Sequence, residues 1–317
     1  MFTVFALVAC SNDFAVQKMI EPEAVDTALP DDSDPPVDTD APDDDTDAAS
    51  WDTGTIQEDT DVPEDTDTPP EVDDDPPPAD DCTETDDLIY ALSRDDGTLY
   101  TFDPSSLTFA SVGRVSCPTT YTAASMSVRR DGTMYVRYGD DKVYAVDLDT
   151  MNCTATAYSD RATRFDSFGM GYSTDSADTW RDQLYVANGD TVGVLDTSSW
   201  TITPIGGMPS QSELTGNADG ELWAVLPLES PAKIIQIDKA DGSALTTIPM
   251  RSFPEPVNID TFAFATWGGD FYVFVGEHGF GRTTDVYEVT ASGTMTKVLA
   301  DVGFDVVGAG VSTCAPS

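Results

Sequence analysis

Residues 143–147 read VYAVD, a short alternating phrase that returns four more times along the chain. The other copies are LYTFD at 99–103, VGVLD at 192–196, IIQID at 234–238 and VYEVT at 286–290. Apolar residues that alternate with other residues indicate a β-strand with one face buried. A phrase that returns at a regular interval indicates one supersecondary unit repeated along the chain.

A hydrophobic–aromatic pair precedes each copy of the phrase and sets the period. The pairs are Ile89-Tyr90, Met134-Tyr135, Leu184-Tyr185, Leu222-Trp223 and Phe271-Tyr272, so successive aromatic residues lie 38 to 50 positions apart. A Thr-rich strand usually follows the phrase, and strands of small residues, such as 168–171 and 307–310, separate one repeat from the next. Four short strands in each period of about 45 residues are typical of the blades of a β-propeller.

The repeats predict an all-β fold, a β-propeller of five four-stranded blades that occupies residues 82–317. Its first strand, at 88–90, has the pattern of the second strand of a blade, and its last strand, at 306–311, has that of an innermost strand. We therefore expect the C-terminal strand to complete the first blade. Small residues belong on innermost strands because the blades crowd together around the axis.

The same closure predicts a disulfide bond between Cys82 and Cys314. Cys82 lies just before the second strand of the closing blade and Cys314 just after its innermost strand. Cys117 and Cys153 then pair by elimination. Four cysteines beyond Cys10 fit an oxidising, exported compartment.

The charge of the chain is concentrated in its first part. The chain carries 58 acidic and 15 basic residues, and residues 1–87 hold 29 of the acids with Lys18 as their one base. An acidic, Pro-rich run with few large apolar residues cannot bury enough surface to fold, so residues 10–81 are expected to form a disordered stalk. The strong negative charge argues against a nucleic-acid partner, which needs clustered Lys and Arg.

An apolar run at residues 2–9, followed by Cys10, predicts an export leader at 1–9. The run is too short to cross a membrane as a helix. Leu7-Val8-Ala9-Cys10 resembles a bacterial lipobox, which implies that Cys10 is acylated and that its lipid is the only link to a membrane. No Lys or Arg precedes the run, so an ordinary cleaved signal stays an alternative.

Four acidic residues stand in equivalent positions near the starts of innermost strands and form the candidate ligand site. They are Asp166, Glu213, Asp260 and Asp305, with Thr122 in the fifth blade. If they ring one mouth of the central channel, they can bind a ligand or a cation such as Ca²⁺. A pair of them can also hydrolyse a glycosidic bond. The plainer interpretation is that they bond backbone N–H groups where each strand begins.

No other motif indicates catalysis or a cofactor. His278 is the single histidine and is expected in an exposed loop, and no nucleophile elbow of the Gly-x-Ser-x-Gly kind occurs. The Asp that ends most copies of the phrase, such as Asp103 or Asp196, is expected to cap its own turn.

The chain resembles uncharacterised surface lipoproteins of myxobacteria and related bacteria, in which a leader and an acidic linker precede a propeller. The matching phrases are LIY at 88–90, ELTG at 213–216, FATWGGD at 264–270 and VGAGVSTC at 307–314. The repeats are also loosely similar to quinoprotein-type and YVTN-type propellers. The resemblance implies the architecture and a location at the outer membrane or cell surface, but no activity.

Three functions remain open from the sequence. The leading hypothesis is a non-enzymatic module, anchored in the cell envelope, that binds a protein or glycan at the cell surface. The second is an extracellular carbohydrate hydrolase that uses the acidic ring. The third is a purely structural envelope protein.

Overall fold

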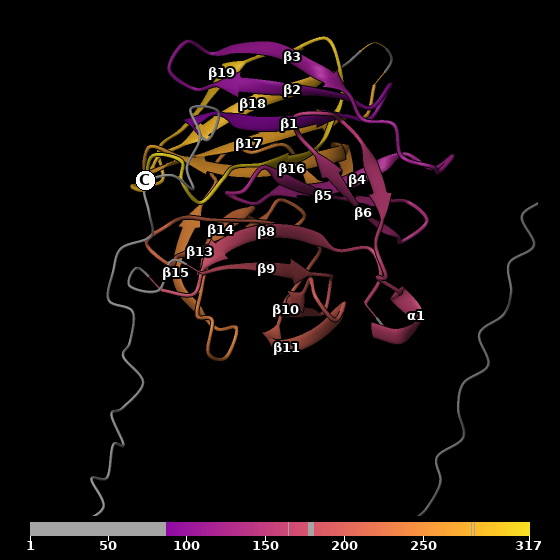
Figure 1. The fold of residues 1–317 in the computed structure, drawn as a ribbon. Coiled ribbons are helices and arrows are strands. Elements are labelled where there is room, and N and C mark those ends of the chain that lie inside the picture. The colour runs from indigo at the N-terminus through magenta and orange to yellow at the C-terminus, as the bar shows by residue number, and fades with distance from the viewer. Residues whose placement is uncertain (1–86, 164, 177–180, 280, 282) are drawn as a thin grey trace, which may run out of the picture. The chain divides into compact units, whose positions relative to one another are not determined.

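The computed structural model describes residues 87–163, 165–176, 181–279, 281 and 283–317. These residues form five four-stranded antiparallel sheets (Figure 1), which confirms the predicted propeller of five blades. The predicted leader and stalk, with Cys10 and Cys82, lie outside the described residues. Within the described part of the chain, no helix has the length and apolar character needed to cross a membrane.

Each blade is one sheet, and we number the blades along the chain. Blade 1 contains β20 (Val306–Gly310), β1 (Ile89–Ser93), β2 (Thr98–Asp103) and β3 (Thr108–Arg114). Blade 2 contains β4 (Ala123–Val128), β5 (Thr133–Tyr138), β6 (Val143–Asp147) and β7 (Cys153–Ala155). Blade 3 contains β8 (Gly169–Thr174), β9 (Asp182–Ala187), β10 (Thr191–Asp196) and β11 (Thr201–Gly207).

The last two blades are built in the same order. Blade 4 contains β12 (Glu213–Gly216), β13 (Leu222–Leu226), β14 (Lys233–Ile237) and β15 (Ala244–Pro249). Blade 5 contains β16 (Ile259–Trp267), β17 (Asp270–Glu277), β18 (Thr284–Val289) and β19 (Met295–Leu299). Two short helical turns, α1 (Asp160–Thr163) and η3 (Pro256–Asn258), lie in the connections that lead to blades 3 and 5.

The C-terminal strand closes the ring, as predicted. β20 pairs antiparallel with β1, with Gly310 opposite Tyr90 and Gly308 opposite Leu92. The innermost strands β4, β8, β12, β16 and β20 each contact the next one around the ring. The first blade is therefore assembled from both ends of the propeller sequence.

Small residues on the innermost strands are required by the close approach of neighbouring blades. A Cβ atom on Gly171 would lie 2.5 Å from the carbonyl carbon of Leu214 in the next blade. One on Gly169 would lie 2.1 Å from the carbonyl oxygen of Ser212. Both distances are far below van der Waals contact, so β8 packs this closely against β12 only with glycine at these positions.

Aromatic residues of the repeated phrases fill the space between blades. Phe102 of blade 1 is completely buried, and its ring lies 5.7 Å from those of Tyr272 and Phe274 in blade 5. The aromatic residues of the repeats thus serve packing, because the aromatic side chain of one blade contacts the next. Trp223, which has in blade 4 the position of Tyr272 in blade 5, is also buried and packs on Phe271.

The aspartates that end the repeated phrase cap their own turns, as expected. Asp103 accepts hydrogen bonds from the backbone N–H of Ser105 and from the hydroxyls of Ser105 and Ser106. The hydroxyls of Ser198 and Ser199 bond Asp196 in the same way and lower its pKa to about 2. These exposed carboxylates have a structural role in the turn.

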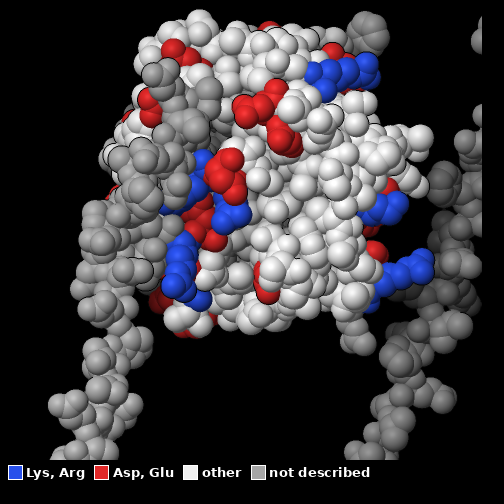
Figure 2. Space-filling model, in the orientation of Figure 1, with Lys and Arg blue, Asp and Glu red and all other residues white. Residues whose placement is uncertain are grey.

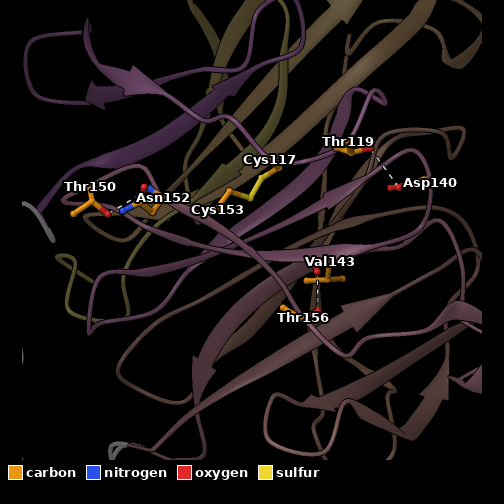
Figure 3. The surroundings of a disulfide bond; sticks show 8 residues. All are labelled: Cys117, Thr119, Asp140, Val143, Thr150, Asn152, Cys153 and Thr156. Carbon is orange, nitrogen blue, oxygen red and sulfur yellow. Dashed lines mark hydrogen bonds between the residues drawn. A yellow bond between two sulfur atoms is a disulfide. The ribbon is translucent and has the colours of Figure 1, made fainter.

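Cys117 and Cys153 form a disulfide bond (Figure 3), which confirms the predicted pairing. Their Cα atoms are 5.0 Å apart, and the bond joins the connection between blades 1 and 2 to the outer strand β7. Cys314 is also disulfide-bonded. Its predicted partner, Cys82, lies outside the described residues, so the Cys82–Cys314 bond stays a prediction.

Loss of the Cys117–Cys153 bond is expected to lower the free energy of unfolding by about 2–4 kcal/mol. The cysteines are 36 residues apart, so the bond restricts a moderately long loop in the unfolded chain. Urea unfolding of the Cys117→Ser/Cys153→Ser double variant of the full chain measures the loss. The Cys117→Ala/Cys153→Ala double variant is the control for side-chain polarity and should lose the same free energy of unfolding. Midpoints equal to that of the wild type would contradict the prediction.

Candidate functional site

A cavity of about 260 Å³ lies at the end of the ring where the innermost strands begin. We call this end of the propeller the mouth. All five blades contribute to the cavity wall, mostly through the first residues of their innermost strands. The lining residues are Arg94, Thr122, Ala123, Ala124, Arg137, Ser167, Phe168, Gly169, Gln211, Ser212, Glu213, Asp260, Thr261, Phe262 and Val307.

Arg94 links two of the predicted acidic residues. It follows β1, and its Nη2 donates hydrogen bonds to Asp260 Oδ2 at 2.7 Å and to Asp305 Oδ2 at 2.5 Å. The bond from Arg94 lowers the pKa of Asp260, which therefore stays ionised at neutral pH. One guanidinium thus bonds two of the four carboxylates that the cation hypothesis counted as ligands.

Glu213 is buried at the start of β12, with 4% of its surface exposed. Its Oε2 accepts a hydrogen bond of 2.8 Å from the hydroxyl of Ser125 on β4. Burial raises the pKa of Glu213 to about 8. Because burial disfavours the charged form, this carboxyl group carries a proton at neutral pH.

Arg137 lies on the second strand of blade 2, and its guanidinium is buried beside the cavity. Its Nε donates to the carbonyl oxygen of Phe168 at 2.8 Å, and its Nη1 lies 3.3 Å from Asp141 Oδ1. The guanidinium also lies over the Phe168 ring, 5.5 Å from its centroid. These contacts hold the Arg137 guanidinium in the cavity wall and pair its positive charge.

The four predicted acidic residues differ in their surroundings. Glu213 and Asp260 line the cavity, and Asp305 is joined to it through Arg94. Asp166 is exposed and stands one residue before the lining segment that begins at Ser167. Two of the four residues thus line the cavity, and the ligand-binding role of all four stays a prediction.

Sequence reasoning missed Arg94 and Arg137. The argument that placed the acids also applies to Arg94, because the residue after β1 must lie at the mouth where β20 begins. Arg137 interrupts the otherwise apolar strand 134–138. A cation in a buried strand needs a carboxylate or carbonyl partner. A charged residue within an apolar strand therefore indicates a polar site nearby.

His278 belongs to the rim of the same mouth. Its Nδ1 lies 3.7 Å from Asp260 Oδ1, and 62% of its side chain is exposed. The structure therefore agrees with an exposed loop position. Across the described ranges, no group of three or more His, Cys, Asp or Glu residues is arranged to hold a metal ion.

Charges on the propeller surface are mixed. On the face drawn in Figure 2, the blue patches of Lys and Arg lie beside red patches of Asp and Glu. Local pairing of this kind also occurs at the mouth, where Arg94 bonds two carboxylates.

No protein-family model matches the chain, and no similar curated protein is found. Many solved structures match the chain. A chain of the mitotic checkpoint complex is 12% identical, covers 71% of this chain and 78% of its own length, and gives a TM-score of 0.39. A protein of unknown function from Bacteroides thetaiotaomicron is 13% identical, with coverages of 69% and 57% and a TM-score of 0.42. One from Bacteroides caccae is 8% identical, with coverages of 70% and 97% and a TM-score of 0.43.

Proposed function

We propose that the chain is an exported envelope protein that presents its propeller as a non-enzymatic binding module. A lipid on Cys10 holds it at the outer membrane or cell surface, and the acidic stalk spaces the propeller from the membrane. The partner is a protein or glycan at the cell surface. Myxobacterial-type surface lipoproteins, which the sequence resembles, have this order of parts.

The polar cavity at the mouth carries the proposal. Five blades converge there, so its wall combines side chains that are far apart in the sequence and fixed by separate sheets. A rigid concave site lined by apolar residues and a few convergent polar groups is the usual form of a ligand site.

Anchoring and exposure are tested together on intact bacteria that produce the full chain with a C-terminal epitope. We expect incorporation of an alkyne-tagged palmitate and antibody binding to whole cells. Cys10→Ser should abolish both, while Cys82→Ser serves as the cysteine control and should keep the label. A label that persists in Cys10→Ser, or an epitope that antibody reaches only in lysed cells, would contradict the proposal.

A carbohydrate hydrolase is the second candidate, and one observation favours it. Two carboxyl groups of the cavity wall have pKa values shifted in opposite directions, with Glu213 raised by burial and Asp260 lowered by Arg94. Such a pair suits a general acid and an ionised partner. Turnover of aryl glycosides by the wild type, lost in Glu213→Gln, supports the hydrolase. Absence of turnover across a broad panel leaves the binding module.

A further inference from the structure

We propose that the mouth cavity binds a small zwitterion, an amino acid whose carboxylate contacts Arg137 and Glu213 and whose ammonium group contacts Asp260. The inference rests on the proposed binding function and adds a small ligand to the macromolecular partner. Two groups with unused hydrogens on one side of the cavity, and an excess of negative charge on the other side, support it.

The Arg137 guanidinium has one amino group that its partners leave unused. Its Nε donates to the carbonyl oxygen of Phe168, and its Nη1 donates to Asp141 and to the carbonyl oxygen of Tyr138. Nη2 has no acceptor among the described residues, although only 8% of the side chain is exposed. Nη2 is also absent from the described side-chain atoms that are sealed from solvent without a partner. Because Arg137 lines the cavity, the Nη2 hydrogens are available to a ligand there.

The carboxyl group of Glu213 has a second unused hydrogen. Ser125 Oγ accepts a hydrogen bond from the backbone N–H of Met170 and donates its own hydrogen to Glu213 Oε2. Since Oε2 accepts, the proton that the buried carboxyl group keeps at neutral pH belongs on Oε1. Oε1 has no partner among the described residues and, like Nη2, is not sealed from solvent. Buried polar groups are almost always bonded, so this O–H indicates an acceptor supplied by a ligand.

Both unused groups lie beside the same piece of backbone. Arg137 Nε bonds the carbonyl oxygen of Phe168 at 2.8 Å, and a Cβ atom on Gly169 would lie 2.9 Å from the carboxyl carbon of Glu213. The guanidinium N–H and the carboxyl O–H can therefore each donate to one oxygen of the same carboxylate, in hydrogen bonds strengthened by charge. A cation at this place would meet two donors and no free acceptor.

The other side of the cavity has the opposite character. Asp260 and Asp305 share the single guanidinium of Arg94, so two carboxylates outnumber one cation. They stand at the entries of blades 5 and 1, whereas the two donors lie against residues of blades 2 and 3. Asp260 Oδ1 accepts no hydrogen bond from a described residue, and its neighbour His278 Nδ1 is 3.7 Å away. An ammonium group supplies both the missing hydrogen bond and the missing positive charge.

A ligand with both charges satisfies both sides of the cavity. A simple carboxylate would meet the negative charge around Asp260, and a simple amine would leave the two donors unused. The cavity volume of about 260 Å³ lies below the range of roughly 300–1,000 Å³ typical of pockets for drug-sized molecules, so the ligand must be small. Phe168 and Phe262 in the wall offer apolar surface to its carbon chain.

Titration calorimetry on the full chain at neutral pH tests the proposal. The probes are glycine, L-alanine and 4-aminobutyrate, which differ in size and in the separation of their charges. Their analogues without the ammonium group are acetate, propionate and butyrate, and those without the carboxylate are methylamine, ethylamine and propylamine. We expect saturable binding of at least one zwitterion. Both of its analogues should bind at least about tenfold more weakly, the effect of one lost charged hydrogen bond.

Two variants separate the two ends of the ligand. Arg137→Lys keeps the positive charge but lacks Nη2, so it should weaken binding of the zwitterion about tenfold. Asp260→Asn should weaken binding of the zwitterion about tenfold more than binding of its carboxylate analogue. The Asp260 side chain is 35% exposed, so this variant should fold. Urea unfolding checks both variants, and Asp260→Asn decides the test if Arg137→Lys does not fold.

Asp219→Asn, in the exposed turn between β12 and β13 at the other end of the ring, is the matched control and should bind like the wild type. The proposal is overturned if no zwitterion binds at about 50 mM, a concentration that saturates a site with a Kd of ~1 mM. It is also overturned if an analogue with one charge binds as tightly as the zwitterion, or if the folded cavity variants bind unchanged. These failures leave the surface-exposure test untouched, so they are distinguishable from failure of the proposed function.

Discussion

Replacing Arg130 by Ala is expected to lower the free energy of unfolding by about 3–5 kcal/mol, because it leaves the carboxylate of Asp182 buried without a counter-ion. Arg130 Nε lies 2.9 Å from Asp182 Oδ2, and its Nη2 lies 2.7 Å from Oδ1. Only 9% of the Arg130 side chain and 1% of the Asp182 side chain are exposed. The bidentate geometry and the burial distinguish this pair from the exposed ion pairs of the propeller.

The position of the pair makes it a clamp on the closed ring. Arg130 follows β4, Asp182 begins β9, and the Arg130 guanidinium also donates to Thr313 Oγ1 at 2.9 Å. The Thr313 hydroxyl in turn donates to Asp182 Oδ1 at 2.7 Å. Blades 2 and 3 are thus tied to the segment after β20, at the ends of the innermost strands opposite the mouth. Loss of Arg130 therefore loosens the closure as well as the pair.

Urea unfolding of the full chain measures the effect, and the neighbouring Arg129→Ala is its control. Arg129 pairs with Asp131 at 3.0 Å, but both side chains are more than 40% exposed, so its loss should cost below about 1 kcal/mol. The double variant Arg130→Ala/Asp182→Ala should lose less than the sum of the two single variants. Equal losses for Arg129→Ala and Arg130→Ala would show that the clamp does not stabilise the ring.

The sequence was sufficient to predict the blades because their repeats constrain one another. Five copies of an alternating phrase fix the number of blades, and the order of strand types fixes where the ring closes. The strands β1 to β3 come without an innermost strand before them, and β20 is the one innermost strand left over at the end of the repeats. The pairing of β20 with β1 therefore followed from the number of blades. The Cys117–Cys153 bond followed only by elimination, because the long connection that carries Cys117 has no strand pattern.

The candidate site was less predictable, because strand register places a residue at the mouth without fixing its partners. Glu213 and Asp260 have equivalent positions in the repeats, yet one is buried against Ser125 and the other is bonded to Arg94. These partners come from other blades, at separations of 88 and 166 residues. No local pattern encodes such contacts, so the charge state of each acid could be learned only from the fold.

Because of Glu213, the free energy of unfolding of the propeller is expected to decrease by about 1.4 kcal/mol for each pH unit between about pH 5 and pH 8. The usual pKa of a Glu carboxyl is 4.5, and burial raises the pKa of Glu213 in the folded chain to about 8. Between these values the folded chain retains a proton that the unfolded chain releases, so raising the pH favours unfolding. Below and above this window both states have the same charge at this residue, and the slope disappears.

Urea unfolding of the wild type and Glu213→Gln at pH 5, 6.5 and 8 tests this pH dependence, because the difference between the two proteins cancels the other titrating groups. Glutamine keeps the size and the hydrogen bond to Ser125 but cannot ionise, so the variant should gain stability relative to the wild type as the pH rises. Asp260→Asn is a control whose effect on stability should have the opposite pH dependence. Arg94 lowers the pKa of Asp260, so its contribution is present above the usual pKa of 3.8 and is lost in acid. A difference between Glu213→Gln and the wild type that stays constant with pH would mean that Glu213 is ionised in the folded protein, and its proposed role as the general acid of a hydrolase would then fail.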